Sequence, residues 1–414
     1  MSQNQGIVLC ESGHTLMQET DDWKFPDDFL WGSATSAHQV EGNNVLNNWY
    51  VWEQKDRIDG QQKSGMACDH YNRFREDIDL LVSLNQNAYR FSIEWSRIEP
   101  KRGKIDRKEI AHYEEVLTYL REKKVKSFVT LHHFTSPIWF DWERSSSVNH
   151  FKSFAELIAK ELGYLVDFWC TINEPHILAQ EGYLEGAFPP GKKSMKSFFR
   201  VLDNMIAGHN AAYHAIHDTL PNALVGAAQN SEYFLPASDD PLDRFVTEIN
   251  REVRNRYFLD RTVCDYIGLQ YYAVSQLRFD PSAPKRFYSS KVSIGLPKSD
   301  LGWSICPDGL YHVLVELQKY KKPVYVTENG IADREDRQRK DYLEGHLKAV
   351  YRAIAYGIDV RGYLHWSLMD NFEWCRGFAL RFGLCEVDYA TQKRTVRASA
   401  KYYAEICKKN SLSV

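Results

Sequence analysis

The sequence lacks any run of 18 apolar residues, the length at which a membrane-spanning helix becomes a candidate. Its first 20 residues, MSQNQGIVLCESGHTLMQET, also lack the basic segment and long apolar segment that together form a secretory signal. We therefore expect no transmembrane helix and a cytoplasmic location.

Metal-binding and disulfide patterns are missing as well. No two of the eight cysteines have the C-x-x-C spacing or another spacing typical of a zinc site. The expectation is free, mostly buried thiols in a reducing compartment. The cysteines are Cys10, Cys68, Cys170, Cys264, Cys306, Cys375, Cys385 and Cys407.

Neither sign of charge is in large excess, because 52 Lys and Arg stand against 55 Asp and Glu, for a net charge of -3. Nucleic acids and anionic membranes are therefore not expected partners. Aromatic residues are plentiful, with 11 Trp, 24 Tyr and 21 Phe. Most must lie in a core, but so many rings also suit a cleft that stacks flat ligands such as sugars.

Short apolar runs alternate with longer amphipathic ones along the chain. Segments 70–84, 201–221 and 341–357 have helical apolar spacing, the second stopping before Pro221 and the third ending at Gly357, a C-cap. The strand-like runs are 29–34, 87–93, 127–134, 166–172, 224–229, 266–272, 324–328 and 362–368.

Eight strand candidates, each followed by a helix or a long loop, predict right-handed βα units and a parallel sheet. Eight is also the number that closes a (β/α)8 barrel. No low-complexity tract, linker or short repeat divides the chain. The expected fold class is therefore α/β, with a loose N-terminal arm over residues 1–22 and a single (β/α)8 TIM barrel over 23–414.

One strand candidate ends in a carboxylate. In WCTINEP, residues 169–175, the apolar run reaches Asn173 and Glu174 and then stops at Pro175. The carboxyl ends of barrel strands open onto the active-site face, so Glu174 is a candidate catalytic residue. An ordinary loop glutamate before a turn would give the same local pattern.

A second strand repeats this arrangement. VYVTENG, residues 324–330, passes from an apolar run through Glu328 to Gly330. Two carboxyl groups flanking one pocket are what cleavage of a glycosidic bond requires, one as a proton donor and one as an anion. The pair at matching strand ends predicts a glycosidase.

These motifs resemble those of glycoside hydrolase family 1, the retaining β-glucosidases and β-galactosidases. The resemblance runs from about residue 25 to 403 and includes FPDDFLWGSATSAHQVEG, YRFSIEWSRIEP, VTLHHFTSPIWF, GYLEGAFPPG, DLGWSICPDGL and HWSLMDNFEWCRGFALRFGL, in the family order. It implies a TIM barrel and a retaining β-glycosidase without cofactor or metal.

The resemblance also implies residue roles. Glu328 matches the nucleophile and Glu174 the acid/base, with carboxyl groups about 5–5.5 Å apart in such enzymes. Arg90 and Tyr272 match the residues that support the nucleophile, although a surface salt bridge and a core tyrosine are the simpler readings of these two. The implied substrate-binding residues are Gln39, His133, Asn173, Trp366, Glu373, Trp374 and Phe382.

Five residues need comment. Gln270 stands where the family usually has Asn, and Phe134 stands where it often has Trp. His132 and His133 together suggest a metal pair, but neighbours in a strand point to opposite faces, so no metal is expected. Glu373, whose charge would repel a phosphate, favours an unphosphorylated sugar.

The predicted function is therefore hydrolysis of terminal β-D-glycosyl residues, glucosides foremost and galactosides and fucosides with them, from a small glycoside or oligosaccharide. The alternatives are a transglycosidase, which passes the glycosyl group to an alcohol, and a catalytically silent sugar-binding barrel, which would lack one of the two glutamates. The oligomeric state does not follow from the sequence.

Overall fold

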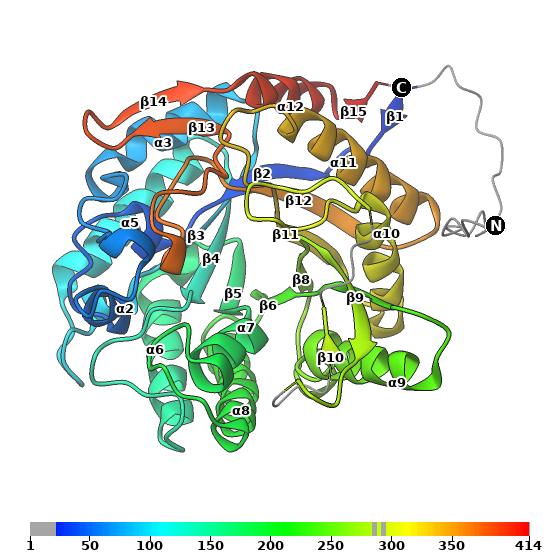
Figure 1. Ribbon diagram of the computed structural model, residues 1–414. Coiled ribbons are helices and arrows are strands. Elements are labelled where there is room, and N and C mark those ends of the chain that lie inside the picture. The colour runs from blue at the N-terminus through cyan, green and yellow to red at the C-terminus, as the bar shows by residue number, and fades with distance from the viewer. Residues whose placement is uncertain (1–21, 284–287, 291–294, 414) are drawn as a thin grey trace, which may run out of the picture.

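The structure, a computed structural model, describes residues 22–283, 288–290 and 295–413 (Figure 1). Apart from Asp22, the expected N-terminal arm lies outside these residues. Eight parallel strands close into a barrel in the order β11-β12-β2-β3-β4-β5-β6-β8. The strands are β2 (Leu30–Ala34), β3 (Ala88–Ser92), β4 (Lys126–His132), β5 (Phe168–Asn173), β6 (Leu224–Asn230), β8 (Ile267–Gln270), β11 (Val324–Asn329) and β12 (Val360–Trp366). All eight predicted strands and the (β/α)8 fold class are thus confirmed.

Helices surround the barrel (Figure 1). The predicted helices over 70–84 and 341–357 correspond to α3 and α11, and Gly357 follows α11 with φ 101°, as a C-cap does. The helix predicted over 201–221 is the latter part of α8, whose start is capped by the Ser194 side chain. The helices are α1 (Ala37–Val40), α2 (Asn48–Glu53), α3 (His70–Ser83), α4 (Trp95–Ile98), α5 (Arg107–Glu122), α6 (Ser147–Leu162), α7 (Pro175–Ala179), α8 (Met195–Thr219), α9 (Pro241–Asn250), α10 (Pro307–Glu316), α11 (Arg339–Ala355) and α12 (Ala398–Lys409).

Short strands outside the barrel were not predicted. β7 (Tyr233–Pro236), β9 (Val274–Phe279) and β10 (Tyr288–Ser289) form a small sheet beside α9, and β13 (Cys385–Asp388) pairs with β14 (Lys393–Val396). β1 (Trp23–Lys24) pairs with β15 (Ser411–Leu412), which joins the two ends of the described chain. These pieces are too short to give a periodic signal.

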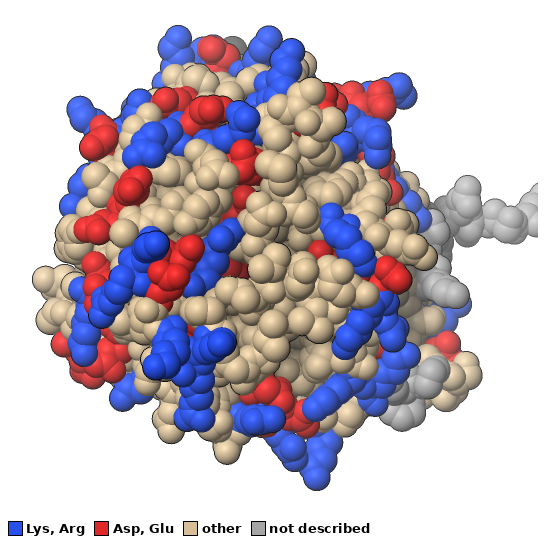
Figure 2. Space-filling model, turned by 90° about the vertical axis from the view of Figure 1, so that its left-hand side faces the viewer, with Lys and Arg blue, Asp and Glu red and all other residues tan. Residues whose placement is uncertain are grey.

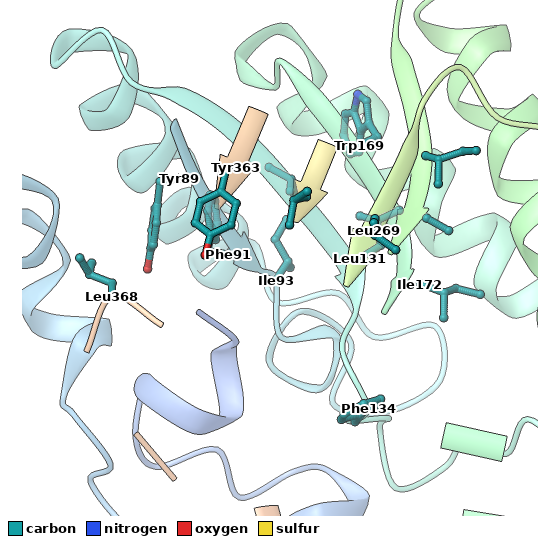
Figure 3. Packing of buried hydrophobic residues seen from close by; sticks show 14 of the residues in the cluster. Tyr89, Phe91, Ile93, Leu131, Phe134, Trp169, Ile172, Leu269, Tyr363 and Leu368 are labelled. Atoms are coloured by element: carbon teal, nitrogen blue, oxygen red, sulfur yellow. The ribbon is translucent and has the colours of Figure 1, made fainter. Parts of the chain in front are cut away.

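Apolar packing occupies two layers. The larger one lies between the strands and the surrounding helices, where Tyr89, Phe91 and Trp169 point away from the barrel axis (Figure 3). The smaller one fills the barrel interior at the amino ends of the strands and contains Ala88, Phe128, Phe168, Tyr266, Tyr325 and Leu364. We call this second cluster the aromatic floor.

The described surface fits the balanced composition. On the face shown in Figure 2, basic and acidic side chains are interspersed, with no large area of one sign. No helix within the described ranges is long and apolar enough to cross a membrane. The cytoplasmic location stays a prediction. The seven cysteines that the structure describes are all free, five of them buried, as expected, whereas Cys10 lies outside the described residues.

Candidate active site

A cavity of about 700 Å³ opens at the carboxyl ends of the barrel strands. Nine of the predicted site residues line it: His133, Asn173, Glu174, Tyr272, Glu328, Trp366, Glu373, Trp374 and Phe382. Gln39 and Arg90 are fully buried beside these residues and hydrogen-bond to them. The structure therefore brings the whole predicted set together.

Glu328 reaches the interior through an irregularity in its strand. Tyr325 belongs to the aromatic floor, so strict alternation would point Thr327 inward and Glu328 outward. The register of β11 shifts between Val326 and Glu328, which turns Glu328 into the cavity and Asn329 toward the helices, where its amide meets the Tyr342 hydroxyl at 2.8 Å. Such irregularities re-aim side chains next to active sites.

β5 uses the same device. Phe168 lies in the floor, and alternation counted from it would point Asn173 outward, but the pairing of β5 shifts between Cys170 and Asn173. Glu174 then takes a left-handed conformation with φ 42°, unusual for a residue with a side chain. Pro175 is the first residue of α7, a position where proline suits a helix. The strand thus ends and the helix begins around the carboxylate.

Glu328 is surrounded by donors. Arg90 from β3 hydrogen-bonds to one of its carboxylate oxygens, and the Tyr272 hydroxyl donates to the other at 2.7 Å. Burial raises the pKa of Glu328, while Arg90, Tyr272 and Gln270 oppose that rise by stabilising the charged form. Both simpler readings, a surface salt bridge for Arg90 and a core position for Tyr272, are wrong.

Glu174 has a different environment. The Asn230 side-chain amide donates to a carboxyl oxygen of Glu174 at 2.9 Å. Burial, followed by the negative charge of Glu328, raises the pKa of Glu174 to about 8. Near neutral pH, Glu174 therefore holds a proton, whereas the Arg90 guanidinium beside Glu328 favours the charged form of that carboxyl group.

Glu373 is a third buried carboxyl group at the cavity. Burial, followed by the charge of Glu328, raises its pKa to about 8 as well. Its hydrogen-bond partners are the side chains of Gln39 and Trp366. The Gln39 amide is itself fully occupied, since it accepts from Ser36 at 2.6 Å and donates to Asn371 at 2.9 Å. Gln39 thus holds the Glu373 loop in place.

The two neighbouring histidines face different surroundings, as alternation predicts. His132 contacts the Ser136 hydroxyl at 2.9 Å and the Trp142 indole at 3.1 Å, among the outer layer. His133 lines the cavity, where its ring stacks with Trp366 at a centroid distance of 5.8 Å. Among the described residues, no three His, Cys, Asp or Glu side chains are grouped in a way that could hold a metal ion.

Aromatic rings form one wall of the cavity. Trp374 lies 5.1 Å from Phe134, and Phe134 in turn lies 5.5 Å from Phe188, both in edge-on contacts. Phe188 occupies space beside Phe134, the residue that departs from the family pattern. Phe382 packs with Trp366 in the same lining. Flat rings of this kind suit the apolar faces of sugars.

Sequence reasoning missed Asn230 and the outer lining. Asn230 ends the run LVGAAQN just as Asn173 ends its own strand, so its position was a usable signal. Farther out, Trp303 is 41% exposed, and Glu232 pairs with Arg254 at 2.8 Å. Trp303 and Glu232 lie in loops and Arg254 lies in a short π-helical segment (Arg251–Arg256), where no periodic pattern marks them.

Comparison with known proteins agrees with this geometry. The model of "Glycosyl hydrolase family 1" matches residues 21–267 and 261–412. β-Glucosidase A of Thermotoga maritima is 34% identical over 442 residues, which cover 94% of this chain and 99% of that protein. A β-galactosidase of Pyrococcus woesei is 31% identical over 499 residues, covering 94% and 98%. The structure of a β-glycosidase from Pyrococcus horikoshii superposes with a TM-score of 0.90 at 39% identity, covering 95% of this chain and 96% of the other.

Proposed function

The chain belongs to glycosyl hydrolase family 1 and is a β-glycosidase, and from this premise we propose that it is a retaining enzyme with Glu328 as nucleophile and Glu174 as acid/base. Its proposed substrates are unphosphorylated β-D-glucosides, with β-galactosides and β-fucosides accepted as well. The relatives named β-glucosidase and β-galactosidase support this range.

The observation that carries the proposal is the unequal surroundings of the two carboxyl groups. Glu328 receives hydrogen bonds from a buried guanidinium and a phenol, whereas Glu174 receives one from an amide. The first environment favours an anion and the second a neutral acid. A retaining glycosidase needs this division of roles before the bond breaks.

In the first step, a Glu328 oxygen attacks the anomeric carbon as the bond to the leaving oxygen breaks. Glu174 gives its proton to that oxygen, which leaves as the free alcohol. The ester at Glu328 no longer carries a charge, so the pKa of Glu174 falls and its carboxylate can act as a base. Glu174 then takes a proton from water, the water oxygen attacks the anomeric carbon, and Glu328 leaves as the carboxylate.

Glu373 supports an unphosphorylated sugar, although for a different reason than its charge. Near pH 7 it holds a proton, so it can both donate to and accept from sugar hydroxyls. Its hydrogen-bond partners, Gln39 and Trp366, are neutral. A buried phosphate dianion needs cations around it, and neither of these partners is one.

A slow substrate tests the assignment. A 2-deoxy-2-fluoro-β-glucoside with a good leaving group should form the glycosyl-enzyme and release it slowly, because the fluorine destabilises both transition states and the leaving group rescues only the first. Peptide mass spectrometry should find the label on Glu328. NMR of the first product from the ordinary substrate should show the β-anomer.

Glu328→Gln, which keeps the shape of the side chain, is the matched control and should take up no label. Label on a different residue would displace Glu328 as nucleophile. The α-anomer as first product would mean inversion and would end the two-step mechanism.

A further inference from the structure

Gln270 lies between the proposed nucleophile and the proposed sugar-binding amide. It ends β8, where its Cα is the register partner of Glu328 on one side and of Asn230 on the other. The side-chain nitrogen of Gln270 donates to the Asn173 amide oxygen at 2.8 Å. The Gln270 amide also hydrogen-bonds to the Glu328 carboxylate. Gln270 is completely buried.

Arg90 closes these contacts into a ring. Its guanidinium hydrogen-bonds to Glu328 and also donates to the Asn173 amide oxygen at 2.6 Å. The Asn173 oxygen thus accepts from two donors, which fixes the orientation of the carboxamide. Its nitrogen is buried at the cavity lining and has no hydrogen-bond partner among the described residues.

The length of Gln270 matters for this ring. Asn173 belongs to β5, and β6 lies between β5 and β8, so the side chain must reach across a strand. The residue of β6 paired with Asn173 is Ala228, whose side chain is small. An asparagine at position 270, one methylene shorter, would retract the amide from Asn173.

The family resemblance implies that Asn173 binds the sugar 2-hydroxyl, and its unpaired nitrogen is the atom free to do so. We infer that Gln270 is a positioning residue that holds the Asn173 carboxamide with this nitrogen facing the 2-hydroxyl and couples the contact to Glu328. The inference rests on the proposed function. It makes Gln270 a determinant of specificity for glycosides that carry a 2-hydroxyl, because contacts to this group strengthen in the transition state of glycoside cleavage.

The test compares an aryl β-glucoside with its 2-deoxy analogue in the same variant. Gln270→Met keeps the length of the side chain and removes the donor. The ratio of kcat/KM for the glucoside to that for the 2-deoxy substrate should fall by about tenfold or more, mainly through kcat. A merely structural defect would lower both substrates together and leave the ratio unchanged.

Gln86→Met is the matched control, since Gln86 is also a buried glutamine but precedes β3 at the opposite end of the barrel. Its ratio should equal that of the unmodified protein. An unchanged ratio in Gln270→Met would overturn the inference.

Gln270→Glu provides a second test if the Met variant does not fold. A carboxylate of the same shape cannot donate to Asn173, so the ratio should fall here too. Its negative charge beside Glu328 should also move the acid limb of the pH–rate profile to higher pH. A normal ratio together with an unmoved acid limb would overturn the inference.

Failure of this inference can be told from failure of the proposed function. If the unmodified protein labels at Glu328 and releases the β-anomer, the proposed function stands whatever the Gln270 variants do. If it does not, the proposed function fails before any variant is made.

Discussion

The two ends of the barrel interior are built from the same eight strands and differ in almost every other respect. At the amino ends, the aromatic floor is apolar, and the rings of Phe128 and Phe168 stack at 4.1 Å with an interplanar angle of 4°. At the carboxyl ends, Glu174, Glu328 and Glu373 lie around one cavity. The floor buries apolar surface, which stabilises the fold, while the upper end buries carboxyl groups, which costs stability.

Backbone conformation separates the two ends as well. Phe134, Glu174 and Trp374 line the cavity and all have positive φ, between 42° and 64°. No residue of the floor does. Strained conformations of this kind persist where the surrounding structure enforces them and gather at functional sites. The comparison indicates that buried carboxyl groups and strained conformations gather at the upper end, whereas the floor contributes mainly to the stability of the fold.

The largest expected effect is the loss of activity when the proposed acid at the upper end, Glu174, is removed. Glu174→Ala should reduce kcat/KM for glycosides with poor leaving groups by about 10²–10⁴-fold, because the leaving oxygen no longer receives a proton. Dinitrophenyl glycosides, which need little protonation, should lose far less. Steady-state kinetics across a series of leaving groups measures the difference.

Added azide should restore turnover of that variant and yield a β-glycosyl azide, since azide can fill the space of the lost carboxyl group and needs no base. Equal losses for all leaving groups, with no azide product, would contradict the role of Glu174.

Truncating a side chain of the aromatic floor should lower the stability of the fold and leave the catalytic activity unchanged. Phe128→Ala should lower the free energy of unfolding by about 3–5 kcal/mol, because a fully buried ring leaves a cavity. Urea unfolding measures the loss, and kcat/KM of the folded protein should stay near its original value.

The control for Phe128→Ala is Phe245→Ala on α9, where the ring is 61% exposed and the expected change is within about 0.5 kcal/mol. If the folded Phe128→Ala protein loses its activity, the assignment of stability to the floor and chemistry to the upper end is wrong.

The smallest effect concerns pH. Burial, followed by the charge of Glu328, raises the pKa of Glu373 to about 8 in the folded protein, from an ordinary value of 4.5. The folded state therefore binds the proton more tightly, and stability falls as pH rises from 4.5 to 8. Glu373→Gln cannot ionise and so avoids this loss. The difference in melting temperature, variant minus unmodified protein, should therefore be a few degrees more positive at pH 9 than at pH 4.

Glu248→Gln is the control for this experiment, because the Glu248 side chain is 55% exposed and its replacement should change the melting temperature far less than Glu373→Gln does. Thermal melts at the two pH values decide the point. A difference for Glu373→Gln that does not change with pH would mean that burial does not raise the pKa of Glu373.

The sequence was sufficient to predict the eight strands and the strand ends at which Glu174 and Glu328 lie, because strand composition and length are local properties. It could not predict the register shifts in β5 and β11, since a slip of one residue leaves the composition of a strand unchanged. Without these shifts, alternation would point Asn173 and Glu328 away from the cavity.

The sequence also could not predict which residues hydrogen-bond to the site residues. Asn230 and Gln270 contact Glu174 and Asn173 only because β6 and β8 close the barrel beside β5. Gln39 is paired with Asn371, more than 300 positions along the chain. Contacts of this kind depend on the closed sheet and have no counterpart in a local sequence pattern.

The left-handed conformation of Glu174 has a consequence for how such a protein can change over generations. Glycine at this position would remove a strain of about 1–2 kcal/mol and a buried carboxyl group together. A single substitution would thus yield a more stable barrel that lacks the proposed acid/base. Glutamate at this position therefore lowers the stability of the fold, a trade that is typical of positions kept for function rather than for packing.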